Sequence, residues 1–266
     1  MNDITKRNPW MWIPTLYFVE GLPYFIVNTI ALAIFKDLGV DNGTLGLVTT
    51  VISLPWLIKP FWSPFVDIFR SKRWWILSMQ VLMAVSVLAV SLLLPASSFT
   101  FVLVMFMVVA FASATHDIAA DGFYMLALDE RRQSAFVGVR STFYRIASVF
   151  GQGVLVVMAG VFQRRMGDIP KAWSLVLLVS AVILAATALY HFFSIPRPAE
   201  DVDCRDRKSA ATIFKEFGSS FVTFFSKKGV WVAILFMLLY RLPEALSVNM
   251  LYPFFKDATS DGGLGL

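Results

Sequence analysis

Long apolar runs are the feature that most constrains how this chain can fold. A helix needs about 20 mainly apolar residues to cross the hydrocarbon core of a bilayer. Runs of about this length recur along the sequence, separated by polar segments, at residues 10–35, 45–62, 74–94, 99–128, 134–162, 172–193 and 230–255. The sequence therefore predicts an all-α membrane protein.

Composition excludes several classes of function. The chain is 58% hydrophobic and 15% charged, whereas a soluble domain carries roughly a quarter charged residues. In a membrane chain the net charge of +5 reports topology, so we expect no nucleic-acid partner. The single cysteine, Cys204, provides neither a disulfide framework nor a cysteine-based metal site. No phosphate-binding glycine loop or hydrolytic triad is present, so we expect no enzyme, no ATP-driven pump and no cofactor.

Basic residues predict the orientation of the chain, because Lys and Arg accumulate on the cytoplasmic side of a membrane. With a cytoplasmic N-terminus, the inner segments hold fourteen Lys and Arg residues and the outer segments hold five. The N-terminus and the long loop 194–229 are therefore predicted to be cytoplasmic. Part of that loop, residues 209–228, has the aromatic spacing of an amphipathic helix lying on the membrane surface.

A weak internal repeat runs through the chain at an offset of 220 residues. It aligns the FKD segment at 35–37 with the FKD segment at 255–257, and it aligns Leu22 and Pro23 with Leu242 and Pro243. Six helices, a cytoplasmic loop and a restart of the first helix describe a parallel repeat of six-helix halves. We predict an N-terminal bundle at 1–193, a central cytoplasmic loop at 194–229 and the start of a second bundle at 230–266, in a fragment of a longer protein.

Ionisable residues occur inside the predicted spans, where an ionised side chain costs at least ~2.5 to 3.5 kcal/mol. Each one needs a partner, water or a proton. The acids are Glu20, Asp117, Asp121 and Glu244, and the bases are Lys59, Arg140, Arg145 and Arg241.

Four of these charges are predicted to pair between the fourth and fifth spans. If these spans are antiparallel neighbours joined by a turn near Arg131, residues equidistant from the turn lie at similar depth. Asp121 then lies level with Arg140, and Asp117 lies level with Arg145. The two pairs could lock the helices together, or they could belong to a substrate or proton pathway.

Glu20 and Arg241 occupy nearly equivalent depths in the first and seventh spans, so a parallel repeat would place both at the central cavity. Their pairing would be a gate that protonation of Glu20 releases, or a static link between halves. His116 could titrate near neutral pH, or it could be a hydrogen-bonded packing residue. We expect no metal site at His116, Asp117 and Asp121, because nearby bases compete for the carboxylates.

Two short motifs resemble those of major facilitator transporters. SPFVDIFRSKR at 63–73 resembles the loop between helices 2 and 3, with Asp67 in the acidic position and Lys72 and Arg73 in the basic ones. IPRP at 195–198 resembles a signature that ends helix 6. The resemblance implies that Asp67, Lys72 and Arg73 form a gating loop. Two positions depart from the usual loop motif, Ser63 and Ile68.

Three longer stretches are similar to the AmpG muropeptide permease family: EGLPYFIVNTIALAIFKDLGV at 20–40, LPWLIKPFWSPFVD at 54–67 and SATHDIAADGF at 113–123. The resemblance places Asp117 and Asp121 on the family's SAT-x-D-x-x-x-D pattern. Glu20 departs from the small polar residue expected there. Members import anhydromuropeptides from cell-wall turnover and are thought to be driven by the proton gradient.

Together these observations predict a proton-coupled secondary transporter that works by alternating access in the bacterial cytoplasmic membrane. Its expected partners are the lipid bilayer, protons and a small-molecule solute, with anhydromuropeptide as the first candidate, and we expect it to act as a monomer. Two alternatives stay open: transport of another sugar or anionic solute, and a membrane sensor of cell-wall fragments that moves nothing.

Overall fold

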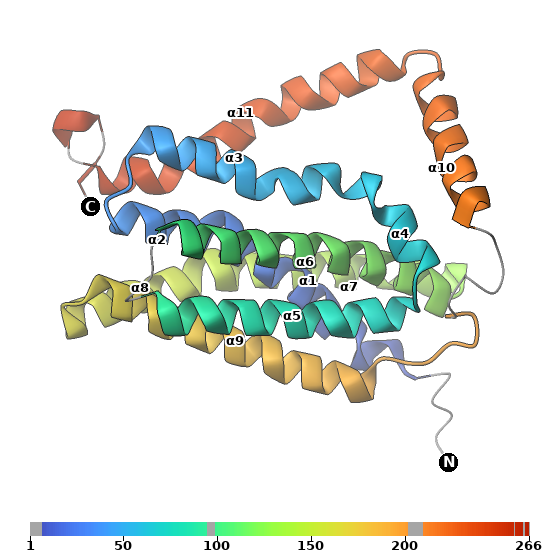
Figure 1. Cartoon of the computed structure of the whole chain (residues 1–266), viewed down its shortest axis with the longest axis horizontal. Coiled ribbons are helices and arrows are strands. Elements are labelled where there is room, and N and C mark those ends of the chain that lie inside the picture. Colours follow the sequence, from blue (N-terminus) through green and yellow to red (C-terminus); the bar gives the residue numbers. More distant parts are fainter. Residues whose placement is uncertain (1–6, 95–98, 202–209, 258, 263, 266) are drawn as a thin grey trace.

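The computed structural model describes residues 7–94, 99–201, 210–257, 259–262 and 264–265, and helices form nearly all of this part of the chain. Most of them lie side by side in one elongated bundle (Figure 1). The α-helices are α1 Ile13–Phe25, α2 Ala31–Asp37, α3 Asn42–Ile58, α4 Ser63–Ile68, α5 Lys72–Leu93, α6 Phe99–Ala127, α7 Glu130–Val149, α8 Leu155–Met166, α9 Ile169–Ser194, α10 Ala210–Phe225 and α11 Val230–Lys256.

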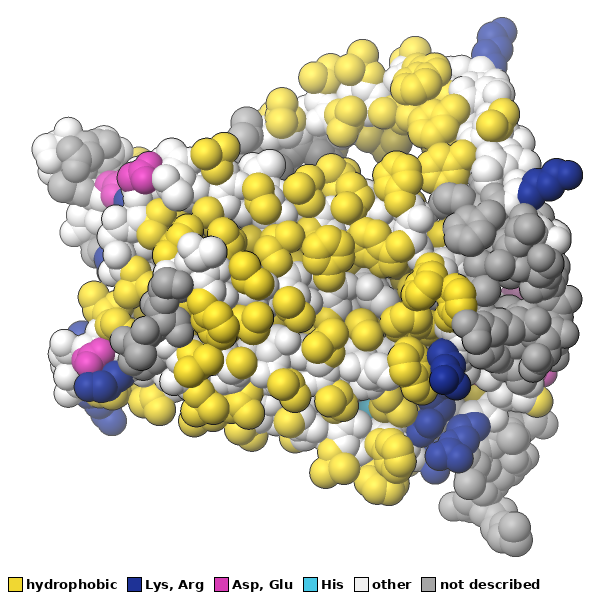
Figure 2. All heavy atoms as spheres, viewed as in Figure 1, with side chains coloured by type: hydrophobic (Ala, Val, Ile, Leu, Met, Phe, Trp, Pro, Cys, Tyr) yellow, Lys and Arg dark blue, Asp and Glu magenta, His cyan; other side chains and the backbone are white. Residues whose placement is uncertain are grey.

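Six stretches of the described residues are helical, long and apolar enough to cross a membrane. They are Pro9–Asp37, Asn42–Phe61, Lys72–Leu93, Phe99–Ala127, Glu130–Met166 and Ile169–Ser194. These are the first six predicted spans, so the all-α, six-helix prediction is confirmed. Hydrophobic side chains cover the middle of the bundle and charged ones gather at its two ends (Figure 2), which fits a protein that spans a bilayer.

Polar side chains begin four of the long helices by accepting a hydrogen bond from a backbone N–H in the first turn. They are Asp41 for α3, Ser71 for α5, Asp129 for α7 and Asp168 for α9. Hydrogen bonds from Thr44 lower the pKa of Asp41, and hydrogen bonds from Lys171 lower the pKa of Asp168. Following the predicted orientation, we call the end with Asp41 and Asp168 the outer end and the end with Ser71 and Asp129 the inner end.

Two of the spans contain a π-helical turn. Residues Ile26–Ile30 join α1 to α2, and residues Phe150–Val154 join α7 to α8. Pro23, inside α1, lacks the N–H that a helix uses at this position, which favours an irregular turn nearby. The two turns meet at Gly151, where an added Cβ would lie 2.7 Å from the Cβ of Phe25. Glycine is therefore required for this close approach of the two spans.

The helices do not pack in chain order. α5 packs on both α6 and α9, α3 packs on α6, and α1 packs on both α6 and α7. The fifth span therefore lies chiefly against the first and not, as the sequence interpretation assumed, against the fourth. This arrangement brings side chains of α1 between those of α6 and α7.

The last two helices lie apart from the six-helix bundle for most of their length. α10, which covers the predicted amphipathic segment, lies at the inner end, and α11 runs back toward the outer end (Figure 1). α11 approaches the bundle where α2 ends and α3 begins, and it diverges from the bundle toward α10 (Figure 1). α11, the seventh predicted span, is not among the six membrane-length stretches of the described residues, where only Val230–Tyr240 is found as a shorter apolar helix. It contacts the bundle mainly at the outer end.

Candidate functional site

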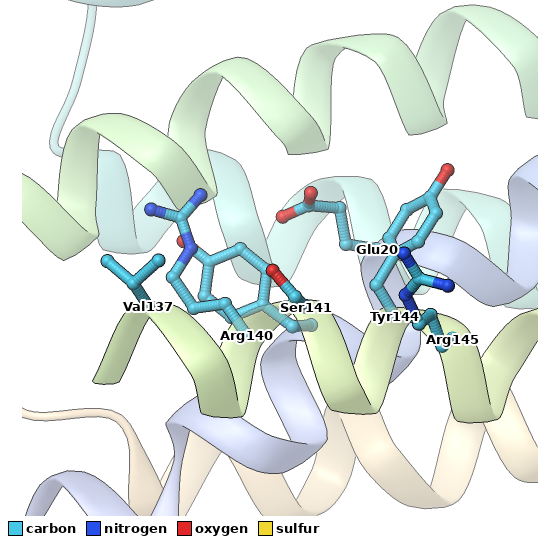
Figure 3. A pocket seen from close by; sticks show the side chains of 7 residues that line it. Glu20, Val137, Arg140, Ser141, Tyr144 and Arg145 are labelled. Atoms are coloured by element: carbon cyan, nitrogen blue, oxygen red, sulfur yellow. The ribbon is translucent and has the colours of Figure 1, made fainter. Parts of the chain in front are cut away.

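A pocket of about 500 Å³ opens between α1 and α7 at mid-length of the bundle. Its lining combines two bases, one acid and two tyrosines: Tyr17, Glu20, Val137, Arg140, Ser141, Tyr144 and Arg145. Figure 3 shows the carboxylate of Glu20 lying between Arg140 and Tyr144 and pointing away from α7. Three residues predicted from the sequence, Glu20, Arg140 and Arg145, therefore share one pocket.

Arg140 is held on three sides. Its guanidinium forms an ion pair with Asp121, and its central carbon lies 4.2 Å from the ring centre of Tyr17 and 4.3 Å from that of Tyr124. The Tyr17 hydroxyl also donates to Oδ1 of Asp121 at 3.2 Å. A guanidinium suits this position because it can lie flat on aromatic faces while it pairs with a carboxylate. The predicted pair of Asp121 and Arg140 is confirmed.

The second predicted pair is wrong. Oδ2 of Asp117 lies 3.7 Å from Nζ of Lys59, which stands at the end of α3. Asp117 does not pair with Arg145. The reason is the packing order: α3 packs on α6, whereas α7 turns onto α1 as it leaves the connecting turn. Arg145, which is exposed, is left in the pocket without an ion pair among the described residues.

Two buried carboxylate oxygens have no hydrogen-bond donor among the described residues, namely Oε2 of Glu20 and Oδ1 of Asp117. Glu20 also lies within electrostatic range of Asp117, Asp121, Lys59 and Arg140. Lys59 and Arg140 each pair with an aspartate, so Glu20 is the acid of this cluster that lacks an ion pair within the described part of the chain. A partly buried carboxylate that has no ion pair of its own is the group best placed to take up a proton.

His116 lies on the other side of α6 from this cluster. It is fully buried, and its Nε2 lies 3.0 Å from the amide nitrogen of Gln80. Oε1 of Gln80 lies 3.0 Å from Nδ1 of His191, whose Nε2 lies 2.8 Å from the Thr15 hydroxyl. This chain joins α6, α5, α9 and α1, so the geometry favours a packing role for His116. No group of three His, Cys, Asp or Glu residues within the described ranges could hold a metal ion.

The predicted gating loop is tied to the segment that follows α9. Lys72 forms an ion pair with Asp67, and the Asp201 carboxylate accepts from the backbone N–H groups of Lys72 at 2.6 Å and Arg73 at 3.0 Å. Nη2 of Arg73 donates to the carbonyl of Phe192 at 2.6 Å. Burial raises the pKa of Asp201 despite these donors. Asp201 therefore caps α5 from a distant part of the sequence.

Tyr17 and Tyr124 were candidates from the sequence for stacking on a sugar ring or for packing, but their contacts with Arg140 were not predicted, and Asp201 was missed. Tyr17 had a usable signal, since it lies three residues before Glu20 and so on the same face of a helix. Tyr124 had the same signal, since it lies three residues after Asp121, whereas Asp201 had none, because its role depends on which segments are neighbours. The side chains of Arg241 and Glu244 lie outside the described residues, and so does the predicted pairing of Arg241 with Glu20.

Comparisons with known proteins agree with this architecture. The model of the Major Facilitator Superfamily matches residues 15–262. The anhydromuropeptide permease of Escherichia coli K12 is 22% identical over 240 residues, which cover 88% of this chain and 46% of the permease. A putative transporter AmpG 4 of Rickettsia conorii is 26% identical over 256 residues, which cover 91% of this chain and 58% of that protein. An uncharacterized protein of Haemophilus influenzae is 25% identical over 248 residues, which cover 90% and 55%. The chain spans about half the length of these relatives.

Proposed function

Because the chain belongs to the Major Facilitator Superfamily, we propose that it forms the N-terminal part of a proton-coupled importer of anhydromuropeptides. In this proposal the six membrane-length stretches form the first bundle and α11 begins the second. The observation that carries the proposal is Glu20, a half-buried residue whose Oε2 is buried and which has no ion pair among the described residues, in the same pocket as two arginines. The names of the Escherichia coli and Rickettsia relatives support the substrate class.

The pocket offers a group for each part of such a substrate. Arg145 is the base that has no ion pair among the described residues, so it is available to a carboxylate of the peptide. Tyr17 and Tyr144 provide aromatic faces of the kind on which a sugar ring packs. Glu20 would accept the coupled proton, because losing its charge removes the cost of an unpaired carboxylate in the membrane. Transport changes no covalent bond, so no catalytic residue is required.

The proposed cycle is alternating access in the bacterial cytoplasmic membrane, with the N-terminus inside. Residues 1–193 would move as one bundle against a second bundle that begins at 230, and the cytoplasmic segment 194–229 would connect them. In parallel repeats of this kind the substrate site lies at the interface of the halves near mid-membrane. The pocket of α1 and α7 supplies the wall that this chain contributes.

The test is uptake of a radiolabelled anhydromuropeptide by cells that express the complete protein, with and without a protonophore. We expect uptake that the protonophore abolishes. Uptake that resists the protonophore would contradict proton coupling. No uptake by protein shown to reach the membrane would contradict the substrate, and labelled anionic sugars would then test the wider class that two arginines in the pocket favour. Specific binding of the muropeptide without uptake would indicate a sensor.

A further inference from the structure

The two FKD segments of the repeat, residues 35–37 and 255–257, contact each other reciprocally. Nζ of Lys36 lies 2.5 Å from Oδ1 of Asp257, and Nζ of Lys256 lies 3.1 Å from Oδ1 of Asp37. Each segment therefore gives its lysine to the aspartate of the other. Such an exchange is what an approximate twofold axis between two equivalent segments would produce, because a twofold contact is self-complementary.

Asp37 is the buried centre of this contact, with only 1% of its side chain exposed. Two of its donors belong to its own bundle: Nε2 of Gln163 at 2.8 Å and Nε1 of Trp173 at 3.0 Å. The others belong to α11: the hydroxyl of Tyr252 at 2.8 Å and the ammonium of Lys256. If α11 moves away, Oδ2 of Asp37 keeps Gln163 and Trp173 while Oδ1 loses Tyr252 and Lys256, so separation requires water to reach Oδ1.

The other pair, formed by Lys36 and Asp257, is partly buried. The side chains of Lys36 and Asp257 are 13% and 19% exposed. Asn42 joins them, since it accepts from Lys36 at 2.7 Å and donates to Asp257 at 2.8 Å. The Lys36 ammonium and then Asn42 lower the pKa of Asp257. The pair is therefore charged at neutral pH, and it weakens only as pH falls through that lowered pKa.

The contact lies far from the pocket. Lys36 is 16 residues beyond Glu20 on one continuous span, or roughly 24 Å at 1.5 Å per residue. α11 approaches the bundle at the FKD segments and diverges from it toward α10 (Figure 1). Figure 2 shows a hollow beneath α11 on the α10 side. The first and seventh spans are thus joined at the outer end and apart at the inner end.

We propose that the reciprocal pairs of the FKD segments are the outer gate of the transporter, closed in this structure. The inference rests on the proposed transport function and adds the residues that close one side of the pocket. Breaking the pairs would let the outer ends of α2 and α11 separate and would open the pocket to the outside. The competing explanation is that the pairs permanently anchor the two halves to each other. The two explanations differ in whether breaking a pair opens the pocket to the outside.

The experiment measures access to the pocket and needs no substrate. The reporter is the Ser141→Cys variant of the complete protein, with its other cysteines removed, because Ser141 lines the pocket. Whole cells are labelled with a membrane-impermeant thiol reagent. Adding Lys36→Asp places two acids together, and we expect labelling of the reporter to become several-fold faster. Adding Asp257→Lys as well restores the pair with its charges exchanged, so labelling should return to the parent rate.

Lys171→Asp is the matched control. Lys171 pairs with Asp168 at 2.8 Å at the same end of the bundle, but both residues belong to the start of α9. Reversing the charge of Lys171 should leave the labelling rate of the Ser141→Cys reporter unchanged. The gate proposal would be overturned if membrane-inserted Lys36→Asp were labelled at the parent rate. It would also be overturned if the double variant were labelled as fast as the single one. A permanent anchor predicts less folded protein and an unchanged labelling rate.

A second measurement separates the gate from the substrate. Lys36→Cys and Asp257→Cys are joined by a short bifunctional thiol reagent, which should hold the outer end closed and stop Ser141→Cys from being labelled from outside. Unchanged labelling after complete cross-linking would overturn the gate. Blocked labelling in a protein that takes up no muropeptide would support the gate and contradict only the proposed substrate.

Discussion

At the scale of single residues, Asp121 is the group on which the geometry around Arg140 depends. It pairs with Arg140 and accepts from Tyr17, and it lies within electrostatic range of Glu20. Asp121→Asn keeps the shape but leaves Arg140 without a countercharge beside a pocket. We expect uptake to fall at least about tenfold while the amount of protein in the membrane is unchanged, because Arg140 loses the carboxylate that holds its guanidinium at the pocket and a neutral amide cannot replace that charge.

Asp129→Asn is the control for this change. Asp129 is exposed and caps α7, and asparagine caps a helix about as well as aspartate. Uptake should therefore be normal. Both variants are measured by uptake of the labelled solute and by immunoblotting of membranes. Full uptake by Asp121→Asn, with an unaltered pH profile, would show that the pair only locks helices together.

Arg140→Lys tests whether the guanidinium matters beyond its charge. Lysine keeps the ion pair with Asp121 but cannot lie flat between the rings of Tyr17 and Tyr124. Loss of cation–π contact worth about 0.5 to 2 kcal/mol predicts uptake reduced by roughly twofold to thirtyfold. The same replacement at Arg132, an exposed residue that pairs with Asp129, should have no effect. Equal uptake by the two variants would mean that only the charge is needed.

These residues show how far the sequence alone could go. The pair of Asp121 and Arg140 was predictable because both lie close to the turn between α6 and α7, where chain order and spatial order agree. Farther from the turn the prediction for Asp117 failed, because α1 packs against α7 there and Lys59 is the nearer base. Which helices become neighbours is decided by packing over the whole bundle, and residue spacing carries no record of it.

At the scale of elements, the contact of the two π-helical turns depends on Gly151. A Cβ there would lie 2.7 Å from the Cβ of Phe25, a separation that backbone or side chains must relieve. Gly151→Ala should destabilise the protein by about 1 to 3 kcal/mol, the usual cost of overpacking. Thermal unfolding of the purified complete protein in detergent measures the loss.

Gly153 provides the comparison, because it lies in the same turn and an added Cβ there would have no heavy atom within 4 Å. Gly153→Ala should be neutral or slightly stabilising, since alanine restricts the unfolded chain more than glycine does. Equal melting temperatures for the two variants would contradict the close approach. Apolar length predicted these spans well, but it could not predict the turns, since a π-helical turn changes the backbone without changing the hydrophobic pattern.

At the scale of the whole molecule, the structure adds a physical contact between the two copies of the internal repeat. The offset of 220 residues predicted a second bundle that begins like the first. It could not predict that the two FKD segments touch, because an internal repeat relates two copies without saying which surfaces meet. The reciprocal contact of Lys36 with Asp257 and of Lys256 with Asp37 needed coordinates for both helices.

The orientation of the whole molecule decides which end of the bundle is the outer gate, and it is testable by fusion. The excess of Lys and Arg, fourteen against five, predicts that the turn at Gly167 is outside and that the segment after α9 is inside. Alkaline phosphatase, which is active only outside the cytoplasm, should be active when fused after Gly167 and inactive when fused after Pro198. A fluorescent protein that matures only inside should give the reverse pattern at the same two points. Phosphatase activity at Pro198 with none at Gly167 would invert the molecule, and the FKD contact would then close the cytoplasmic side of the pocket.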